Sequence, residues 1–224
     1  MLKHILWDWN GTLLDDVWLC VDIINEILEK YNLEKLSIES YKNIFDFPVK
    51  DYYANIGFDF NKISFEKVGT EFIEKYNKRV SECKLQKDAK HVLEHFNSCG
   101  IKQSILSARD KTQLDLDLEN YGIKKHFTHI SGLDNHYAAE KLENAKLLLN
   151  KIEAKPTEIL MIGDTTHDFE IAKKLKLKHI ILDIGHQSKK RLKKLDAIIH
   201  TNLYEIAHPI ISISTQEFFN KNGK

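Results

Sequence analysis

Ile5-Leu6-Trp7-Asp8-Trp9-Asn10-Gly11-Thr12-Leu13-Leu14-Asp15-Asp16 is the stretch that decides the fold of this chain. Its short apolar run ends in a carboxylate, Asp8, and a glycine turn and a segment of helical spacing follow at once. This order predicts that Asp8 lies at the carboxyl end of a strand, where open α/β sheets gather their ligands. Gly11 permits unusual dihedral angles, so the turn after the strand can direct successive backbone N–H groups at an anion.

The composition of the 224-residue chain fits one large domain or a domain with an insertion, since 42% of the residues are hydrophobic. The 33 basic and 33 acidic side chains cancel, so no global field attracts nucleic acid or an anionic membrane. The three cysteines are odd in number and lack a CxxC pair, which favours reduced thiols over a disulfide framework or a zinc site. The N-terminus lacks a signal-peptide pattern, and no apolar run approaches the ~18 residues of a membrane span. We therefore expect a soluble cytoplasmic protein, either a monomer or a homodimer.

Asp8-Trp9-Asn10-Gly11-Thr12-Leu13 resembles the motif Asp-x-Asp-Gly-Thr-Leu, which opens the phosphatases of the haloacid dehalogenase (HAD) superfamily. The match has one departure, because Asn10 stands where those phosphatases carry their general acid. The resemblance implies that Asp8 is the nucleophile and that Thr12 helps to bind the phosphate. It also implies that the backbone carbonyl of Asn10 is a metal ligand.

The segment from residue 16 to 82 has helical spacing and no convincing buried strand. Its position is similar to that of the small helical cap in the phosphoglycolate phosphatase and β-phosphoglucomutase-like branch of the superfamily, and residues 47–58 are similar to the substrate-facing region of that cap. We therefore expect a cap at 16–82 inserted into a core formed by 1–15 and 83–224. Such a cap could open and close on its two linkers, and a packed helical subdomain with no moving part is the alternative.

The rest of the chain alternates helical patterns, one of them from about residue 139 to 151, with short apolar runs at 101–106, 127–130, 159–162, 180–182 and 197–199. Alternation of this kind predicts a parallel sheet covered on both faces, with right-handed crossovers. The predicted fold class is therefore α/β: a Rossmann-like parallel sheet core, as in the HAD fold, with an inserted α-helical cap.

Gly163-Asp164-Thr165-Thr166-His167-Asp168 resembles the fourth motif of the superfamily, Gly-Asp-x-x-x-Asp. Strand ends lie together in a parallel sheet, so Asp8 and Asp164 can meet and supply oxygen ligands for Mg²⁺. The resemblance places Asp168 in the outer shell of this metal, and its spacing from Thr165 also predicts a capping box. His167 is left out, because eleven histidines are scattered through the chain and the family does not need this one.

Two further residues complete the predicted site. Ser107 follows the apolar run Ile105-Leu106, where the superfamily's second motif has a hydroxyl that holds a phosphate oxygen, and the Ala108 N–H could assist it. Lys141 corresponds to the third motif, a lysine that neutralises the nucleophile and the phosphate. Lys146 competes for this role, because the Lys-Pro pair of many relatives is missing.

Asn10 changes the expected mechanism, because an amide has no titratable proton near neutral pH and cannot act as a general acid or base. The favoured interpretation is a Mg²⁺-dependent phosphatase of a small phosphorylated metabolite that is slow or selective for good leaving groups, with Asp15, Asp16 or a cap residue assisting. A second is C–P bond cleavage as in HAD phosphonoacetaldehyde hydrolases, which use a cap lysine as a Schiff base, with Lys50 as the candidate. A third is a HAD protein that only binds a phosphorylated ligand. Asn10 could also be an engineered replacement of aspartate.

Overall fold

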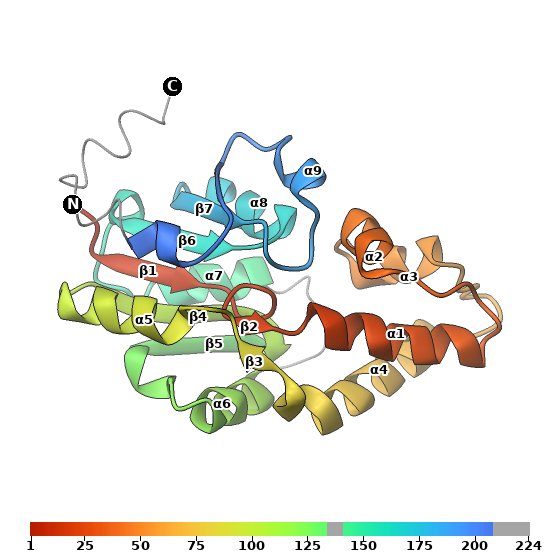
Figure 1. Ribbon diagram of the computed structural model, residues 1–224. Coiled ribbons are helices and arrows are strands. Elements are labelled where there is room, and N and C mark those ends of the chain that lie inside the picture. Colours follow the sequence, from red (N-terminus) through yellow and green to blue (C-terminus); the bar gives the residue numbers. More distant parts are fainter. Residues whose placement is uncertain (134–140, 208–224) are drawn as a thin grey trace.

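The computed structural model describes residues 1–133 and 141–207 and has a six-stranded parallel sheet at its centre (Figure 1). The strand order is β5-β4-β1-β6-β7-β8. Their bounds are β1 His4–Trp7, β4 Lys102–Asp110, β5 His129–Leu133, β6 Ile159–Gly163, β7 Lys178–Leu182 and β8 Ile198–His200. From β1 the chain proceeds through β4 to β5 on one side, then returns to build β6, β7 and β8 on the other. Because this reversal occurs around β1, the carboxyl end of β1 is the expected ligand-binding edge.

Both faces of the sheet are covered, because alternate side chains of a strand point to opposite sides. Ile5 and Trp7 of β1 belong to a core cluster with α5, Ala89–Ser98, and α6, Lys111–Asn120. Leu6 between them belongs to a second cluster on the other face, with α7, Lys141–Leu149, and α8, Thr166–Lys174. The short helix α9, Lys189–Leu192, lies after β7. The expected α/β class is confirmed.

Residues 16–82 contain four α-helices, as the helical spacing predicts. They are α1 Val17–Lys30, α2 Ile38–Ile44, α3 Val49–Asn55 and α4 Phe65–Arg79, and no strand forms among residues 17–79, all of which are described. The chain enters this segment through β2, Leu14–Asp15, and leaves it near β3, Lys84–Leu85, which pair antiparallel. The two linkers therefore lie side by side where the predicted cap begins and ends. The exact cap boundaries at residues 16 and 82 stay a prediction.

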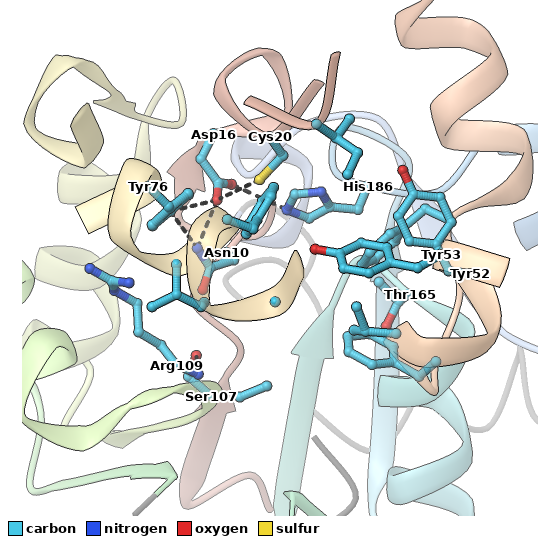
Figure 2. A pocket seen from close by; sticks show the side chains of 18 of the residues that line it. Asn10, Asp16, Cys20, Tyr52, Tyr53, Tyr76, Ser107, Arg109, Thr165 and His186 are labelled. Carbon is cyan, nitrogen blue, oxygen red and sulfur yellow. Dashed lines mark hydrogen bonds and ion pairs between the residues drawn. The ribbon is translucent and has the colours of Figure 1, made fainter. Parts of the chain in front are cut away.

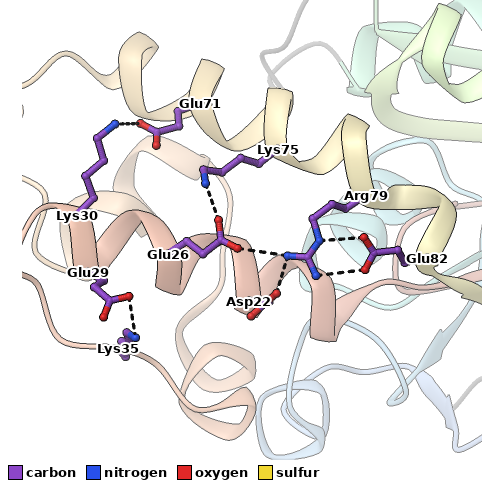
Figure 3. A network of polar contacts seen from close by, with 9 residues as sticks. All are labelled: Asp22, Glu26, Glu29, Lys30, Lys35, Glu71, Lys75, Arg79 and Glu82. Carbon is purple, nitrogen blue, oxygen red and sulfur yellow. Dashed lines mark hydrogen bonds and ion pairs between the residues drawn. The ribbon is translucent and has the colours of Figure 1, made fainter.

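Helices α1 and α4 pack along each other and form the longest part of the insertion (Figure 1). Ile23, Ile27 and Val68 are fully buried and belong to the main core cluster. Ion pairs join the exposed sides of the same two helices: Arg79 contacts Asp22 at 2.6 Å (Figure 3). Lys30–Glu71 and Lys75–Glu26 repeat the pattern along the helices. Exposed pairs of this kind contribute little free energy each, so apolar burial holds α1 to α4.

Some predicted element bounds are wrong. The strand predicted at 101–106 runs as β4 to Asp110, because its far end still pairs with β5 beyond an irregularity in the register. The strand predicted at 127–130 begins two residues later, as β5. The helix predicted from about residue 139 is described from Lys141, and its first two residues lie outside the described ranges. Among residues 1–133 and 141–207, no helix combines the length and the apolar character that crossing a bilayer requires.

Candidate active site

Asp8 lies directly after β1, where its backbone N–H donates to Ile162 O at 2.9 Å and continues the pairing with β6. Its side chain is buried, and Lys141 Nζ donates to Asp8 Oδ1 at 2.5 Å. The same ammonium donates to Asp168 Oδ1 at 2.7 Å. A lysine is almost never this buried unless it is paired. Burial alone would lower the pKa of Lys141, but Asp168 and Asp8 raise it, so the side chain stays charged between the two carboxylates.

Asp164 follows β6 and is held from two sides. Thr12 Oγ1 donates to Asp164 Oδ1 at 3.0 Å, and the His186 backbone N–H donates to Oδ2 at 2.6 Å. Two glycines make room for this carboxylate: a Cβ on Gly11, which has φ +74°, would lie 2.5 Å from Asp164 Oδ2, and one on Gly185 would lie 2.0 Å from it. The glycine of the opening motif is thus required for its backbone conformation and for the space that Asp164 occupies.

Asp168 is the third residue of α8 and forms the predicted capping box with Thr165. Thr165 Oγ1 accepts from the Asp168 backbone N–H at 3.3 Å, and Asp168 Oδ2 accepts from the Thr165 N–H at 3.1 Å and from its hydroxyl at 2.6 Å. The other oxygen of Asp168 binds Lys141. The side chain therefore fixes the start of α8 and the position of the lysine together.

One carboxylate oxygen from each of Asp8, Asp164 and Asp168 lies within 4.8 Å of the other two, and all three residues are buried. Burial, together with the neighbouring acids Asp168 and Asp164, raises the pKa of Asp8 to about 8, although Lys141 opposes the shift. Burial likewise raises the pKa of Asp164 to about 6. If all three carboxyls ionise, their negative charge exceeds what Lys141 alone can neutralise. A divalent cation with oxygen ligands fits both the donor set and the excess charge.

Ser107 and Ala108 lie on β4 beside β1 and line the same cavity as Asp8 and Lys141. Ser107 is buried, and its Oγ accepts from the Arg109 backbone N–H at 3.1 Å. Thr12 differs, because it is not among the cavity-lining residues that the structure describes and its hydroxyl is engaged with Asp164. Its predicted contact with phosphate stays a prediction.

Asn10 acts as a hydrogen-bond donor in this site. Its Nδ2 donates to Asp16 Oδ2 and to Tyr76 Oη, each at 2.7 Å (Figure 2). Asp16 is fully buried and also accepts from the Gly11 N–H at 2.9 Å and from Tyr76 Oη at 2.7 Å. Asp16 is the N-cap residue of α1, but its side chain makes no capping hydrogen bond, because it is turned toward these donors.

The comparisons with known proteins agree with this geometry. Residues 5–182 match the family model described as haloacid dehalogenase-like hydrolase. The chain belongs to this family. A curated relative, the pyrophosphatase PpaX of Oceanobacillus iheyensis, is 29% identical over 171 residues, which cover 75% of this chain and 77% of the relative. The resemblance found in the sequence and the expected hydrolase class are confirmed.

Solved structures of similar fold extend the agreement to 92–95% of the chain. A predicted phosphatase from Clostridium acetobutylicum superposes with a TM-score of 0.80 at 18% identity, covering 95% of this chain and 100% of that one. A predicted phosphoglycolate phosphatase from Haemophilus somnus superposes with a TM-score of 0.71 at 19% identity, covering 92% and 96%. At these identities the likeness establishes the fold, including the helical insertion.

Three residues of this HAD-like hydrolase lie in the site although the sequence analysis did not single them out. His186 Nε2 pairs with Asp16 at 3.2 Å, and its Nδ1 lies 2.9 Å from Tyr41 Oη. Burial would lower the pKa of His186, but Asp16 and the neighbouring acids raise it to about 9. The signal in the sequence that could have identified His186 is its position in the loop after β7, because that loop starts at the same sheet edge as Asp8.

The other two are Arg109 and Tyr76. Arg109 Nε pairs with Asp117 at 2.5 Å, its Nη1 donates to Asn77 at 2.9 Å, and its guanidinium lies 4.8 Å from the centre of the Tyr76 ring. Arg109 follows Ser107-Ala108 directly, which was a readable signal. No signal in the sequence pointed to Tyr76, because the residue that its hydroxyl contacts, Asp16, lies 60 residues away along the chain.

The remaining candidates lie away from the cavity. Lys50 is exposed and does not line it, and its ammonium lies 5.8 Å from the centre of the Phe60 ring. Lys146, the competitor of Lys141, is exposed and pairs with Glu143 at 2.7 Å. His167 packs on Phe47 with ring centres 4.9 Å apart, outside the acidic cluster. Of the two lysines considered for the third motif, only Lys141 reaches Asp8.

Proposed function

We propose that this HAD-like hydrolase is a Mg²⁺-dependent phosphatase of a small phosphorylated metabolite, acting through an aspartyl-phosphate on Asp8. The observation that carries the proposal is the ammonium of Lys141, which bridges Asp8 and Asp168 at the floor of the cavity. This arrangement aims one carboxylate at the cavity and supplies a positive charge beside it, as attack on an anionic phosphate requires.

In the proposed reaction, a carboxylate oxygen of Asp8 attacks phosphorus, and the bond between phosphorus and the leaving oxygen breaks. Water then hydrolyses the acyl phosphate and regenerates Asp8. Ser107 is suited to donate to a phosphate oxygen from β4, and Lys141 offsets the charge of nucleophile and phosphate. Mg²⁺, when bound, would reduce the repulsion between carboxylate and phosphate. Asp8, Asp164 and the backbone carbonyl of Asn10 would hold it, with Asp168 acting through an outer-shell water.

The leaving group must depart without a proton from Asn10. Asp16 does not replace the missing acid in this arrangement, because it stays ionised. Burial alone would raise the pKa of Asp16, but His186, Asn10 and Tyr76 hold it below its usual range. The proposal therefore includes a preference for leaving groups that are stable as anions, since general acid catalysis of ~10²–10⁴-fold is missing.

The test is the dependence of the rate on the leaving group, measured with Mg²⁺ on p-nitrophenyl, phenyl and benzyl phosphate. We expect kcat/KM to fall steeply as the leaving alcohol becomes a weaker acid. In Asn10→Asp the new carboxyl lies beside Asp16, so the two acids share a proton that can be donated. That variant should raise the rate for benzyl phosphate by ~10²-fold or more and change p-nitrophenyl phosphate little. If the rate depended on the leaving group equally in the parent protein and in Asn10→Asp, the role given to Asn10 would be overturned.

Asp8→Asn is the control for the nucleophile, because it keeps the shape of the side chain and removes its negative charge. It should abolish turnover of all three esters while circular dichroism and the unfolding transition show an intact fold. Turnover that persists in Asp8→Asn would rule out an aspartyl-phosphate intermediate on Asp8. C–P bond cleavage is not proposed, because Lys141 is the only lysine among the described cavity-lining residues and it is bound to two carboxylates.

A further inference from the structure

The cavity above Asp8 extends from the phosphate end into the helical insertion and has a volume of about 260 Å³. Its floor is polar, with Asp8, Lys141 and Asp164, whereas its walls come from α2, α3 and α4. Figure 2 shows Tyr52 and Tyr53 on one side and Tyr76 on the other, with Asn10 between them and Ser107 below. Aromatic side chains dominate these walls: Tyr41, Phe47, Tyr52, Tyr53, Phe72 and Tyr76.

The described lining residues of the cavity offer no unpaired cation to a second anionic group of the substrate. Among the described lining residues, the basic side chains are Lys141, Arg109 and His186. Each is already paired with carboxylate: Lys141 with Asp8 and Asp168, Arg109 with Asp117, and His186 with Asp16. A carboxylate or a second phosphate on the leaving group would therefore lose its hydration without gaining an ion pair, which is unfavourable.

Gly69 on α4 marks where the leaving group would fit. It lines the cavity, and a Cβ built on it would meet no atom within 4 Å. Glycine inside a helix is destabilising relative to alanine, so a glycine that protein packing does not require is unexpected at this position. Gly69 lines the same cavity as the aromatic side chains, which favour a flat ring.

We propose that the substrate is a phosphate monoester of a small uncharged phenol, whose ring lies between the tyrosine walls and Gly69. This inference rests on the proposed function, since it places the phosphate at Asp8. The polar end of the cavity at Asn10 favours the same leaving group as its aromatic walls. A phenol leaves as a phenolate, taking the electron pair of the P–O bond without needing a proton, and Asn10 cannot supply one.

The first experiment compares phenyl phosphate with 4-carboxyphenyl phosphate, which have the same scissile bond and differ in one distal charge. We expect kcat/KM for phenyl phosphate to be higher by ~30–100-fold, because the carboxylate is buried without a partner. Equal or reversed values would overturn the inference while leaving the phosphatase intact.

Calorimetry with phenylphosphonate and 4-carboxyphenylphosphonate, in the presence of Mg²⁺, separates binding from turnover. Tighter binding of the uncharged phosphonate supports the assigned position of an uncharged ring even if neither ester is hydrolysed, in which case the proposed hydrolysis fails. Equal binding of the two overturns the inference. Absence of binding by both overturns the inference and the phosphate site together.

Two variants test the walls directly. Ile73→Lys adds a cation to the cavity wall and should raise kcat/KM for 4-carboxyphenyl phosphate by ~10-fold relative to phenyl phosphate. Ile38→Lys, at an exposed position of α2 outside the cavity, is the matched control and should leave the ratio unchanged. An unchanged ratio in Ile73→Lys would count against the proposed position of the ring.

Gly69→Leu should raise KM for phenyl phosphate by ~10-fold or more, because its side chain fills the space assigned to the ring. The Tm should not fall, since the cavity accepts the side chain and α4 gains a better helix former. Lys67→Leu adds the same side chain to an exposed position of α4 outside this cavity and should leave KM unchanged. An unchanged KM in Gly69→Leu contradicts the inference.

Discussion

Lys141 is the side chain on which the acidic cluster depends, because it is the cation that contacts both Asp8 and Asp168. In Lys141→Met these carboxylates remain buried without a counter-charge. We expect the free energy of unfolding without metal to fall by ~3–5 kcal/mol and turnover to fall by ~10²-fold or more. Added Mg²⁺ should restore part of the stability, since it supplies positive charge to the same oxygens.

Lys146→Met is the matched control, because Lys146 lies on the same helix but is exposed and paired only with Glu143. Chemical denaturation with and without Mg²⁺, together with initial rates, distinguishes the two lysines. Loss of activity in Lys146→Met with retention in Lys141→Met would reverse the assignment of the third motif.

The residues that reach the cavity from the strand ends could be predicted from the sequence, because each follows a readable apolar run. Asp8, Ser107 and Asp164 are in this group. The partners of Asp16 could not be predicted, since Tyr76 and His186 approach it from separations that only the packed insertion brings together. Asp16 stands at the N-cap position of α1, but its side chain turns to these distant partners and makes no capping hydrogen bond.

Strand β1 and its neighbour β4 are joined by a buried polar pair as well as by backbone hydrogen bonds. His4 Nε2 lies 2.8 Å from Ser104 Oγ. Burial, with the nearby positive charges of His129 and Lys102, lowers the pKa of His4 to about 4. The folded state thus favours the neutral ring, whereas the unfolded chain binds a proton near pH 6.5.

The stability that neutral His4 contributes should be complete above pH 6.5 and should be lost as the pH falls toward 4. Urea denaturation at pH 7 and pH 5 measures this loss. In His4→Gln the difference between the two pH values should be smaller. His91→Gln, at an exposed position of α5, should behave as the parent protein does. If His4→Gln and the parent protein lost the same stability, another group would be responsible.

The central strands were predictable from continuous apolar runs, and the helices of the insertion from spacings of three and four. The end of β4 could not be predicted, because residues 107–110 continue the strand through pairing with β5 alone. Strand length there depends on a neighbour that the local sequence does not reveal. For the same reason Ser107 could be placed at the sheet edge but not inside a strand.

Besides the contacts of α4 with Asn10 and Arg109, the insertion and the core are joined at two places. The paired linkers β2 and β3 form one. At the other, the loop after β7 and the start of α9 contact the end of α2 and the residues that follow it. Ser188 N donates to Lys42 O at 2.9 Å, and Gln187 Nε2 donates to Phe45 O at 3.1 Å. Arg191 pairs with Asp46 at 2.7 Å and also donates to Phe45 O. These contacts hold the aromatic walls of the cavity over Asp8.

Arg191→Met should weaken this second junction without touching the acidic cluster, because Arg191 is not among the residues that line the cavity. We expect faster amide hydrogen exchange at residues 41–47 and a KM that rises by about 3–10-fold, as the binding-competent closed arrangement becomes less populated. The rate of the chemical step should change less than KM. Lys190→Met, at the exposed neighbouring position of α9, is the control. If exchange and KM in Arg191→Met matched those of the parent protein, the insertion would not depend on this junction to stay closed, and the paired linkers with the buried contacts of α1 would suffice.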